Sequence, residues 1–195
     1  MSVLCNKGEG LALTKSHPQL RKIVIRIGWD SILYTGDEDF DLDTAVFLLD
    51  ENGQVEDEND LIFYNNPISV DGGVVHTGDE EEVKIDLTRI SATVHKLVFV
   101  ITIYDALLRQ QHFGQGKKLF ISICDDVTGT ELVQYNVEEK FTTETAIIGI
   151  ELKRQEREWE IKALGTGIVG GLTELCTQFG LGLEDKEETD LDFMW

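Results

Sequence analysis

The sequence changes from charged to apolar side chains within one stretch, Gly36-Asp-Glu-Asp-Phe-Asp-Leu-Asp-Thr-Ala-Val-Phe-Leu-Leu-Asp50. Five of the seven residues from Asp37 to Asp43 are acidic, and Ala45 to Leu49 are all apolar. In an extended chain, Asp41 and Asp43 share one face. Hard divalent cations take several carboxylate and carbonyl ligands, so this pair could serve one ion at the start of a strand. The alternative is a solvated acidic loop in a very acidic protein.

The segments around this stretch have the period of two, or the continuous β-branched runs, that are typical of strands. Turns rich in Gly, Asn and Asp separate them. The predicted strands are 20–29, 44–49 (apolar on both faces and therefore central), 61–64, 74–76, 83–87, 97–104, 119–124 and 132–135, followed by a hairpin of 145–154 with 159–164.

Helical periodicity is confined to two places. Residues 105–111 are predicted to form one or two helical turns. Near the end, Ile168, Leu172, Leu175 and Phe179 stand at helical spacing, with Gly180 as a stop signal. The fold class predicted is a β-sandwich of two sheets with short helices and one C-terminal amphipathic helix. We expect one domain over residues 1–183 and a mobile acidic tail over 184–195.

The charge balance limits the partners. The chain has 37 acidic and 17 basic residues, a net charge of −20. A nucleic-acid-binding domain needs a basic footprint, and an anionic membrane surface would repel this protein. The cysteines, Cys5, Cys124 and Cys176, form no CxxC pair, which argues against a disulfide framework or a zinc site. With no signal-peptide pattern and no apolar run long enough to span a bilayer, we expect a cytoplasmic protein.

No catalytic motif stands out. The chain lacks GxxxxGK[ST] and GxSxG, and its acidic stretch does not fit an EF-hand, because Leu42 or Thr44 falls where that loop needs glycine. The four histidines have no metal-binding spacing, and we expect each to be a surface or packed side chain. We therefore predict a protein that is not an enzyme.

Six segments together resemble one known family. In order they are Gly28-Trp29-Asp30, Phe40-Asp41-Leu42-Asp43, Phe63-Tyr64-Asn65-Asn66, Val75-His76-Thr77-Gly78-Asp79, Ile101-Thr102-Ile103-Tyr104 with Phe113-Gly114-Gln115, and Glu158-Trp159 before Ala163-Leu164-Gly165. From about residue 3 to about residue 182, this ordered set looks like the tellurium-resistance (TerD-type) family of bacterial stress proteins.

The resemblance implies a β-sandwich that binds Ca²⁺ in acidic loops and takes part in resistance to tellurite and other chemical stress, with no established enzymatic activity. Carried onto this chain, it implies that Asp30, Asp41 and Asp43 bind the metal together with Asp79 and Glu82 of the neighbouring loop. Whether Asp37, Glu80 or Glu81 also bind is left open.

The chain departs from the family at that second loop. Relatives have a longer Asn/Gly/Asp-rich loop after the Gly-Asp pair, whereas here Gly78-Asp79 runs directly into Glu80-Glu81-Glu82. Alternation puts Glu80 and Glu82 on the polar face, opposite to Val83 and Ile85. Fewer oxygens should leave fewer ions than the two that the resemblance implies.

Two other functions remain open. One is an interaction module without metal, whose acidic loops dock a basic protein partner. The other is ligand or nucleotide sensing, against which the lack of a GxxxxGK[ST] phosphate loop counts. The resemblance also suggests other tellurium-resistance or membrane-complex proteins as partners. The charge balance argues against nucleic acid, and the lack of a long apolar run argues against direct insertion into a membrane.

Overall fold

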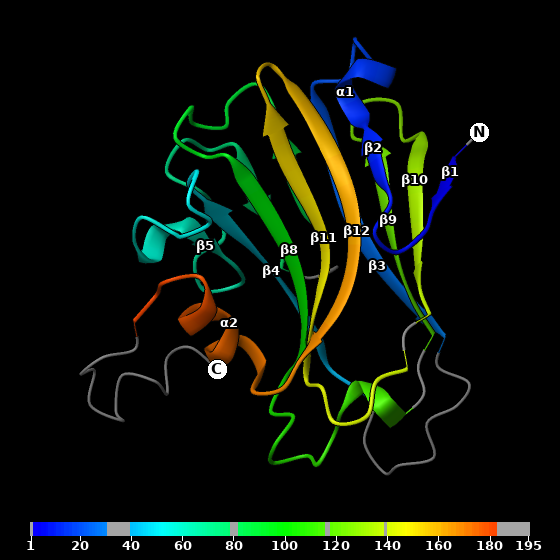
Figure 1. Ribbon diagram of the computed structural model, residues 1–195, viewed down its shortest axis with the longest axis vertical. Coiled ribbons are helices and arrows are strands. Elements are labelled where there is room, and N and C mark those ends of the chain that lie inside the picture. Colours follow the sequence, from blue (N-terminus) through cyan, green and yellow to red (C-terminus); the bar gives the residue numbers. More distant parts are fainter. Residues whose placement is uncertain (1, 31–39, 79–81, 116–117, 139, 183–195) are drawn as a thin grey trace.

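Two six-stranded sheets stack face to face and enclose the main core, so the predicted β-sandwich is confirmed (Figure 1). This computed structural model describes residues 2–30, 40–78, 82–115, 118–138 and 140–182, apart from the side chains of Trp29 and Asp30. The predicted tail, 184–195, lies outside the described residues.

Sheet A has neighbouring strands that are antiparallel, except that its edge strand β1 runs parallel to β10. In spatial order its strands are β1 (Val3–Cys5), β10 (Glu131–Val137), β9 (Lys118–Asp125), β3 (Lys22–Asp30), β7 (Val83–Asp86) and β6 (Val74–His76).

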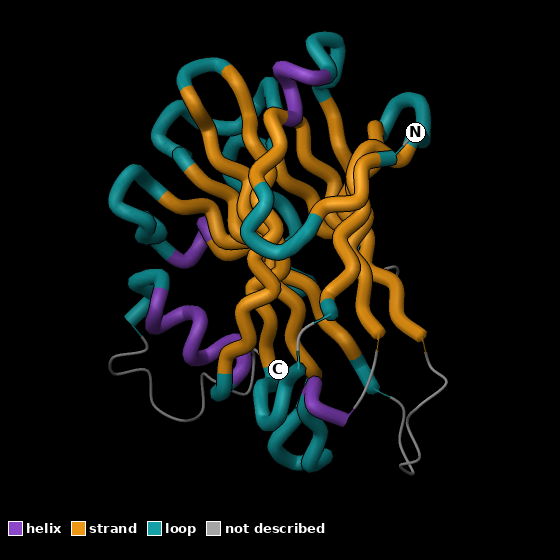
Figure 2. Tube along the Cα trace, turned by 45° about the vertical axis from the view of Figure 1, so that its right-hand side comes forward, coloured by secondary structure: helices purple, strands orange, loops and turns teal. Residues whose placement is uncertain are grey.

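Sheet B is antiparallel throughout. In spatial order its strands are β2 (Gly10–Ala12), β12 (Glu158–Ile168), β11 (Ala146–Gln155), β8 (Lys96–Ile103), β4 (Leu42–Leu49) and β5 (Leu61–Ile62). The short helices are α1 (Leu13–Ser16), η2 (Glu58–Asp60), η3 (Phe113–Gln115) and α2 (Gly171–Gln178), and Figure 2 shows them at the ends and on the outside of the sheets.

Sheet B has an apolar core on each face. Along β4, Val46 and Leu48 belong to the core between the sheets, whereas Phe47 and Leu49 belong to a second core beneath α2. A strand buried on both faces reads as a continuous apolar run, which explains the sequence of β4 and of the neighbouring β8.

Helix α2 covers the outer face of sheet B. Its buried side chains are Leu172, Leu175 and Cys176, and the Phe179 ring that follows lies 4.8 Å from the ring of Phe47. Gly180 has φ +89°, a left-handed conformation that suits glycine at a helix end. The helix predicted here is confirmed, although Ile168 belongs to β12. Among the described residues, no helix has the length and apolar character needed to cross a bilayer.

The segment 105–111 forms hydrogen-bonded turns, so the prediction of helix here is wrong. Asp105 has φ 49° and Gln110 has φ 53°, which are left-handed values that a right-handed helix cannot contain. The 3-10 helix η3 follows at Phe113–Gln115 instead.

Candidate functional site

Asp41 and Asp43 lie where the first acidic segment enters sheet B at the start of β4. Leu42 packs in the core between the sheets and Thr44 is 1% exposed, so Asp43, between them, faces outward and is half-buried. The carbonyl oxygen of Asp41 accepts a hydrogen bond from Tyr104 N at 2.9 Å, and the Asp41 side chain is 59% exposed. Both carboxylates therefore lie near the point where β4 begins.

Residues after β8 complete this end of the molecule. Nη2 of Arg109 lies 3.9 Å from Oδ2 of Asp41, and the Arg109 guanidinium carbon lies 5.3 Å from the centre of the Tyr104 ring. Burial raises the pKa of the Tyr64 hydroxyl, and the charges of Asp43 and Asp105 raise it further. Sequence analysis missed Arg109 and Asp105, because only the fold brings the loop after β8 beside the start of β4.

Glu82, in the second acidic segment, has a different environment. It is 5% exposed, and its Oε2 accepts a hydrogen bond from Nε of Arg26 at 2.5 Å. Its Oε1 lies 3.5 Å from Nζ of Lys84. This hydrogen bond raises the pKa of the Arg26 guanidinium. Glu82 thus has the position of a structural ion-pair partner.

The described geometry does not bring Glu82 and Asp43 together. Val83 and Ile85 face the core between the sheets, so Glu82 lies with Lys84 on the outer face of sheet A. Asp43 lies on the outer face of sheet B, and the whole sandwich separates the two. The main chain of Asp30 pairs with Lys118 at the end of β3. The Asp30 side chain and all of Asp79 lie outside the described residues.

The described side chains fit a calcium ion only in part. Asp41 and Asp43 offer hard oxygen donors, which Ca²⁺ prefers, but they supply only part of a shell of about 6–8 oxygens. Among the described residues, no group of three or more His, Cys, Asp or Glu side chains is placed to hold a metal ion. The pair therefore fits as two ligands of a larger set, and the five-residue site stays a prediction.

His76 joins the two acidic segments from inside the sandwich. Its Nδ1 accepts a hydrogen bond from Gly78 N at 3.1 Å, so the neutral ring carries its proton on Nε2. That nitrogen donates to Oγ1 of Thr44, 3.0 Å away on the other sheet. His76 is 4% exposed, as expected for a packed histidine. The bond connects β6 to β4 immediately after Asp43.

Thr44→Val should lower the free energy of unfolding by about 1 kcal/mol, because it leaves a buried donor of His76 without this partner. Thr102→Val is the matched control, since the Thr102 hydroxyl makes no hydrogen bond to any described residue. Urea unfolding of both variants measures the difference. Equal stability of the two would show that the bond between the sheets contributes nothing.

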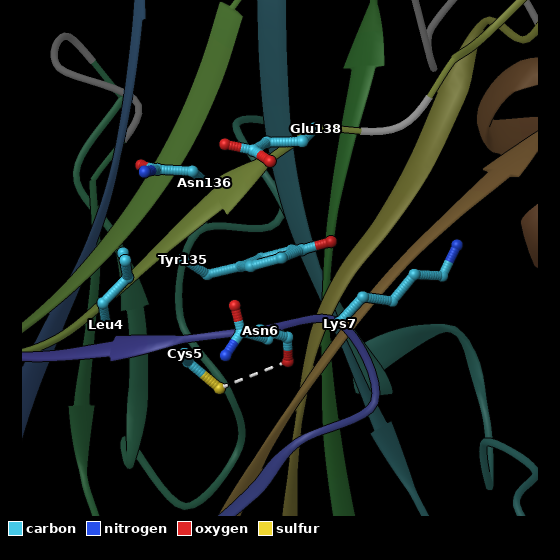
Figure 3. A pocket seen from close by; sticks show the side chains of 7 residues that line it. All are labelled: Leu4, Cys5, Asn6, Lys7, Tyr135, Asn136 and Glu138. Atoms are coloured by element: carbon cyan, nitrogen blue, oxygen red, sulfur yellow. Dashed lines mark hydrogen bonds between the residues drawn. The ribbon is translucent and has the colours of Figure 1, made fainter.

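A separate small pocket of about 170 Å³ opens beside β1 and β10. Figure 3 shows the Tyr135 ring lying across it, above Cys5, whose Sγ donates to the carbonyl oxygen of Asn6 at 3.7 Å. Burial raises the pKa of the Cys5 thiol, and the charge of Glu9 raises it further. A thiol held in its neutral form is a poor nucleophile and a poor metal ligand, so we place no function in this pocket.

Comparison with known proteins gives a consistent result. The model of the TerD domain matches residues 1–179. General stress protein 16U of Bacillus subtilis (strain 168) is 44% identical, with 93% of this chain and 98% of that protein covered. Tellurium resistance protein TerD of Serratia marcescens is 42% identical with the same coverage.

Solved structures show the same fold. A homologue of the telluride resistance protein TerD from Streptomyces coelicolor A3(2) superposes with a TM-score of 0.61 at 18% sequence identity. The match covers 80% of this chain and 95% of that one.

Proposed function

This chain belongs to the TerD domain family, and on that premise we propose that it is a calcium-binding, non-enzymatic stress-response protein. Its role would be protection against tellurite or other chemical damage, as the names of the relatives describe for those proteins. We further propose that it acts in the cytoplasm, with other tellurium-resistance or membrane-complex proteins as partners.

The observation that carries the calcium proposal is the carboxylate pair on the outer face of sheet B. Asp41 is exposed, and its contact with Arg109 is long, at 3.9 Å, so a cation can replace the guanidinium without disturbing a buried bond. Asp43 lies on the same face and is held by the β4–β8 ladder. Asp30 and Asp79 are the further ligands that the sequence suggests. Bound Ca²⁺ would neutralise these crowded carboxylates and order them.

A reduced number of ions is the second part of the proposal. The ion pairs of Glu82 with Arg26 and Lys84 leave it unsuited to share an ion with Asp43. The second acidic segment therefore offers few oxygens, in agreement with its short loop. We propose fewer than the two ions implied by the resemblance to the family.

Ca²⁺ should raise the thermal stability of protein that has been treated with a chelator. When the Ca²⁺ concentration is ten times Kd, the free energy of unfolding should rise by about 1.4 kcal/mol, because the ion binds the folded state alone. For a chain of this length that corresponds to about 3–6 °C in Tm. Scanning fluorimetry with and without Ca²⁺ measures the shift. An equal gain with Mg²⁺ would count against a calcium site, because Mg²⁺ gives up its waters reluctantly.

A metal-free interaction module is the second candidate. It is supported by the contact of Arg109 with Asp41, since a guanidinium from a basic partner could take the same place. Thermal stability that changes with neither Ca²⁺ nor Mg²⁺ would favour this alternative.

A further inference from the structure

A groove of about 660 Å³ opens at the end of the sandwich where β8 and β12 finish. It is lined by the end of β8 and the loop that follows it (residues 102–103, 105–108 and 110–112), by Thr143 and Thr145, and by residues 169–173, which lead from β12 into α2. Figure 1 shows these segments at the lower end of the molecule, with α2 beside the last residues of β12.

Large apolar side chains in this groove are exposed. Among the residues that line it, Leu107 is 90% exposed, Leu108 is 81% exposed and Val169 is 61% exposed. Single exposed apolar residues are ordinary on protein surfaces, but a contiguous apolar patch in a groove is typical of a binding site.

The loop that carries the two leucines has a defined conformation. Asp105 and Gln110 both have positive φ, which is uncommon for residues other than glycine. Arg109 N donates to the carbonyl of Asp105 at 2.9 Å, and Gln111 N donates to that of Ala106 at 2.8 Å. The backbone thus holds Leu107 and Leu108 outward at the cost of local strain, which proteins tend to store at functional sites.

Acidic residues lie in the groove and next to it. Asp105 lines the groove. Glu144 is next to the lining residues Thr143 and Thr145, and Glu174 lies beside the lining residue Gly170. Hydrogen bonds from the main-chain N–H groups of Thr142 and Thr143 hold the pKa of Glu144 below its usual value, so its carboxylate stays charged. The guanidinium of Arg109 lies beside Asp41. The groove is therefore apolar inside and negative at its rim.

We propose that this groove docks a partner protein through a segment with neighbouring large apolar side chains flanked by lysine or arginine. Apolar side chains would cover Leu107, Leu108 and Val169, and the basic residues would meet the acidic rim. The proposal goes beyond calcium binding and does not depend on it.

Charge argues against the two nearest competitors for the groove. Residues 184–195 of the same chain end in Phe193-Met194-Trp195, but they carry six acidic residues and one lysine. A second copy would bring the same acidic rim and a net charge of −20. Like charges across an interface oppose association, whereas a basic segment is attracted.

The test uses the full chain and a synthetic amphipathic peptide of leucine and lysine, with a peptide in which every lysine is replaced by glutamate as its control. Fluorescence anisotropy should show that the lysine peptide binds at least about tenfold more tightly than the glutamate peptide. The double variant Leu107→Ser, Leu108→Ser should lose at least about tenfold in affinity for the lysine peptide. Because both leucines are exposed, this variant should fold normally.

Val70→Ser and Val127→Ser are the matched controls, because these valines are 88% and 78% exposed and do not line the groove. They should bind the lysine peptide as the wild type does. The leucine substitutions leave every charge in place, so a general attraction of the peptide to an acidic protein would give equal binding to all variants and would overturn the proposal.

Three further variants test the acidic rim and distinguish a basic partner from the other possible occupants of the groove. Asp105→Asn and Glu174→Gln should each weaken binding of the lysine peptide, and unchanged binding in both would contradict the acidic rim. A chain cut after residue 182 that binds the peptide at least about tenfold more tightly would overturn the proposal in favour of the protein's own tail. Self-association that the double leucine variant abolishes would overturn it in favour of a second copy.

Discussion

Replacing Asp41 or Asp43 by asparagine should lower the affinity for Ca²⁺ about a hundredfold, while the apo protein stays folded. Changing a residue that only supports a metal ligand typically lowers the metal affinity about 10–100-fold. Loss of a carboxylate that binds the ion directly should reach the upper end of that range. The apo fold should survive because removing one of several crowded like charges relieves repulsion. Isothermal titration of each variant measures the affinity, and circular dichroism checks the fold.

Asp126→Asn is a suitable control for these variants. Its carboxylate lies 4.0 Å from Nζ of Lys84, on the outer face of sheet A, so its loss should leave the Ca²⁺ affinity unchanged. Apo protein that unfolds on substitution of Asp41 or Asp43 would identify these residues as structural hydrogen-bond acceptors. The proposed cation site would then be withdrawn.

Glu82→Gln should lower the free energy of unfolding by about 2 kcal/mol, because it removes the charge from a buried carboxylate that accepts a hydrogen bond from a guanidinium. The structure places Oε2 of Glu82 2.5 Å from Nε of Arg26, in a side chain that is 6% exposed. Arg26 itself is 46% exposed, so water can solvate the guanidinium that is left behind and limits the cost. Chemical denaturation measures the loss.

The same variant separates a structural role from metal binding. Its Ca²⁺ affinity should stay within about twofold of the wild type, whereas a tenfold loss would show that Glu82 is a ligand after all. Glu151→Gln is the control, since its contact with Nζ of Lys96 is 3.8 Å long and partly exposed. The free energy of unfolding of Glu151→Gln should fall by less than about 1 kcal/mol.

Strand periodicity was sufficient to predict every strand of both sheets except β1 and β2. The long runs of β4 and β8 carry strong signals, because both faces are buried. The short edge strands β1 and β2 were missed: each has three residues, and their place in the sheets depends on distant partners such as Val133 and Ile161. For residues 105–111 the sequence predicts helical turns, because local sequence does not reveal the positive φ of Asp105 and Gln110.

The candidate site shows what periodicity cannot decide. Alternation correctly put Glu82 on the polar face of its strand, with Lys84. The sequence did not reveal that this strand joins sheet A while Asp43 belongs to sheet B, so that the two carboxylates face opposite sides of the sandwich. Arg109 was missed for the same reason: its contact with Asp41 spans 68 residues of sequence and exists only in the folded chain.

Calorimetric titration of chelator-treated protein with Ca²⁺ tests the central proposal most directly. The proposal predicts saturable binding with a stoichiometry below two, which Asp41→Asn and Asp43→Asn strongly weaken and Glu82→Gln leaves intact. No measurable binding, together with unchanged Tm, would contradict the calcium proposal and favour the metal-free interaction module. Two tight and equivalent sites would contradict the reduced number of ions and show that the short second loop costs the protein nothing.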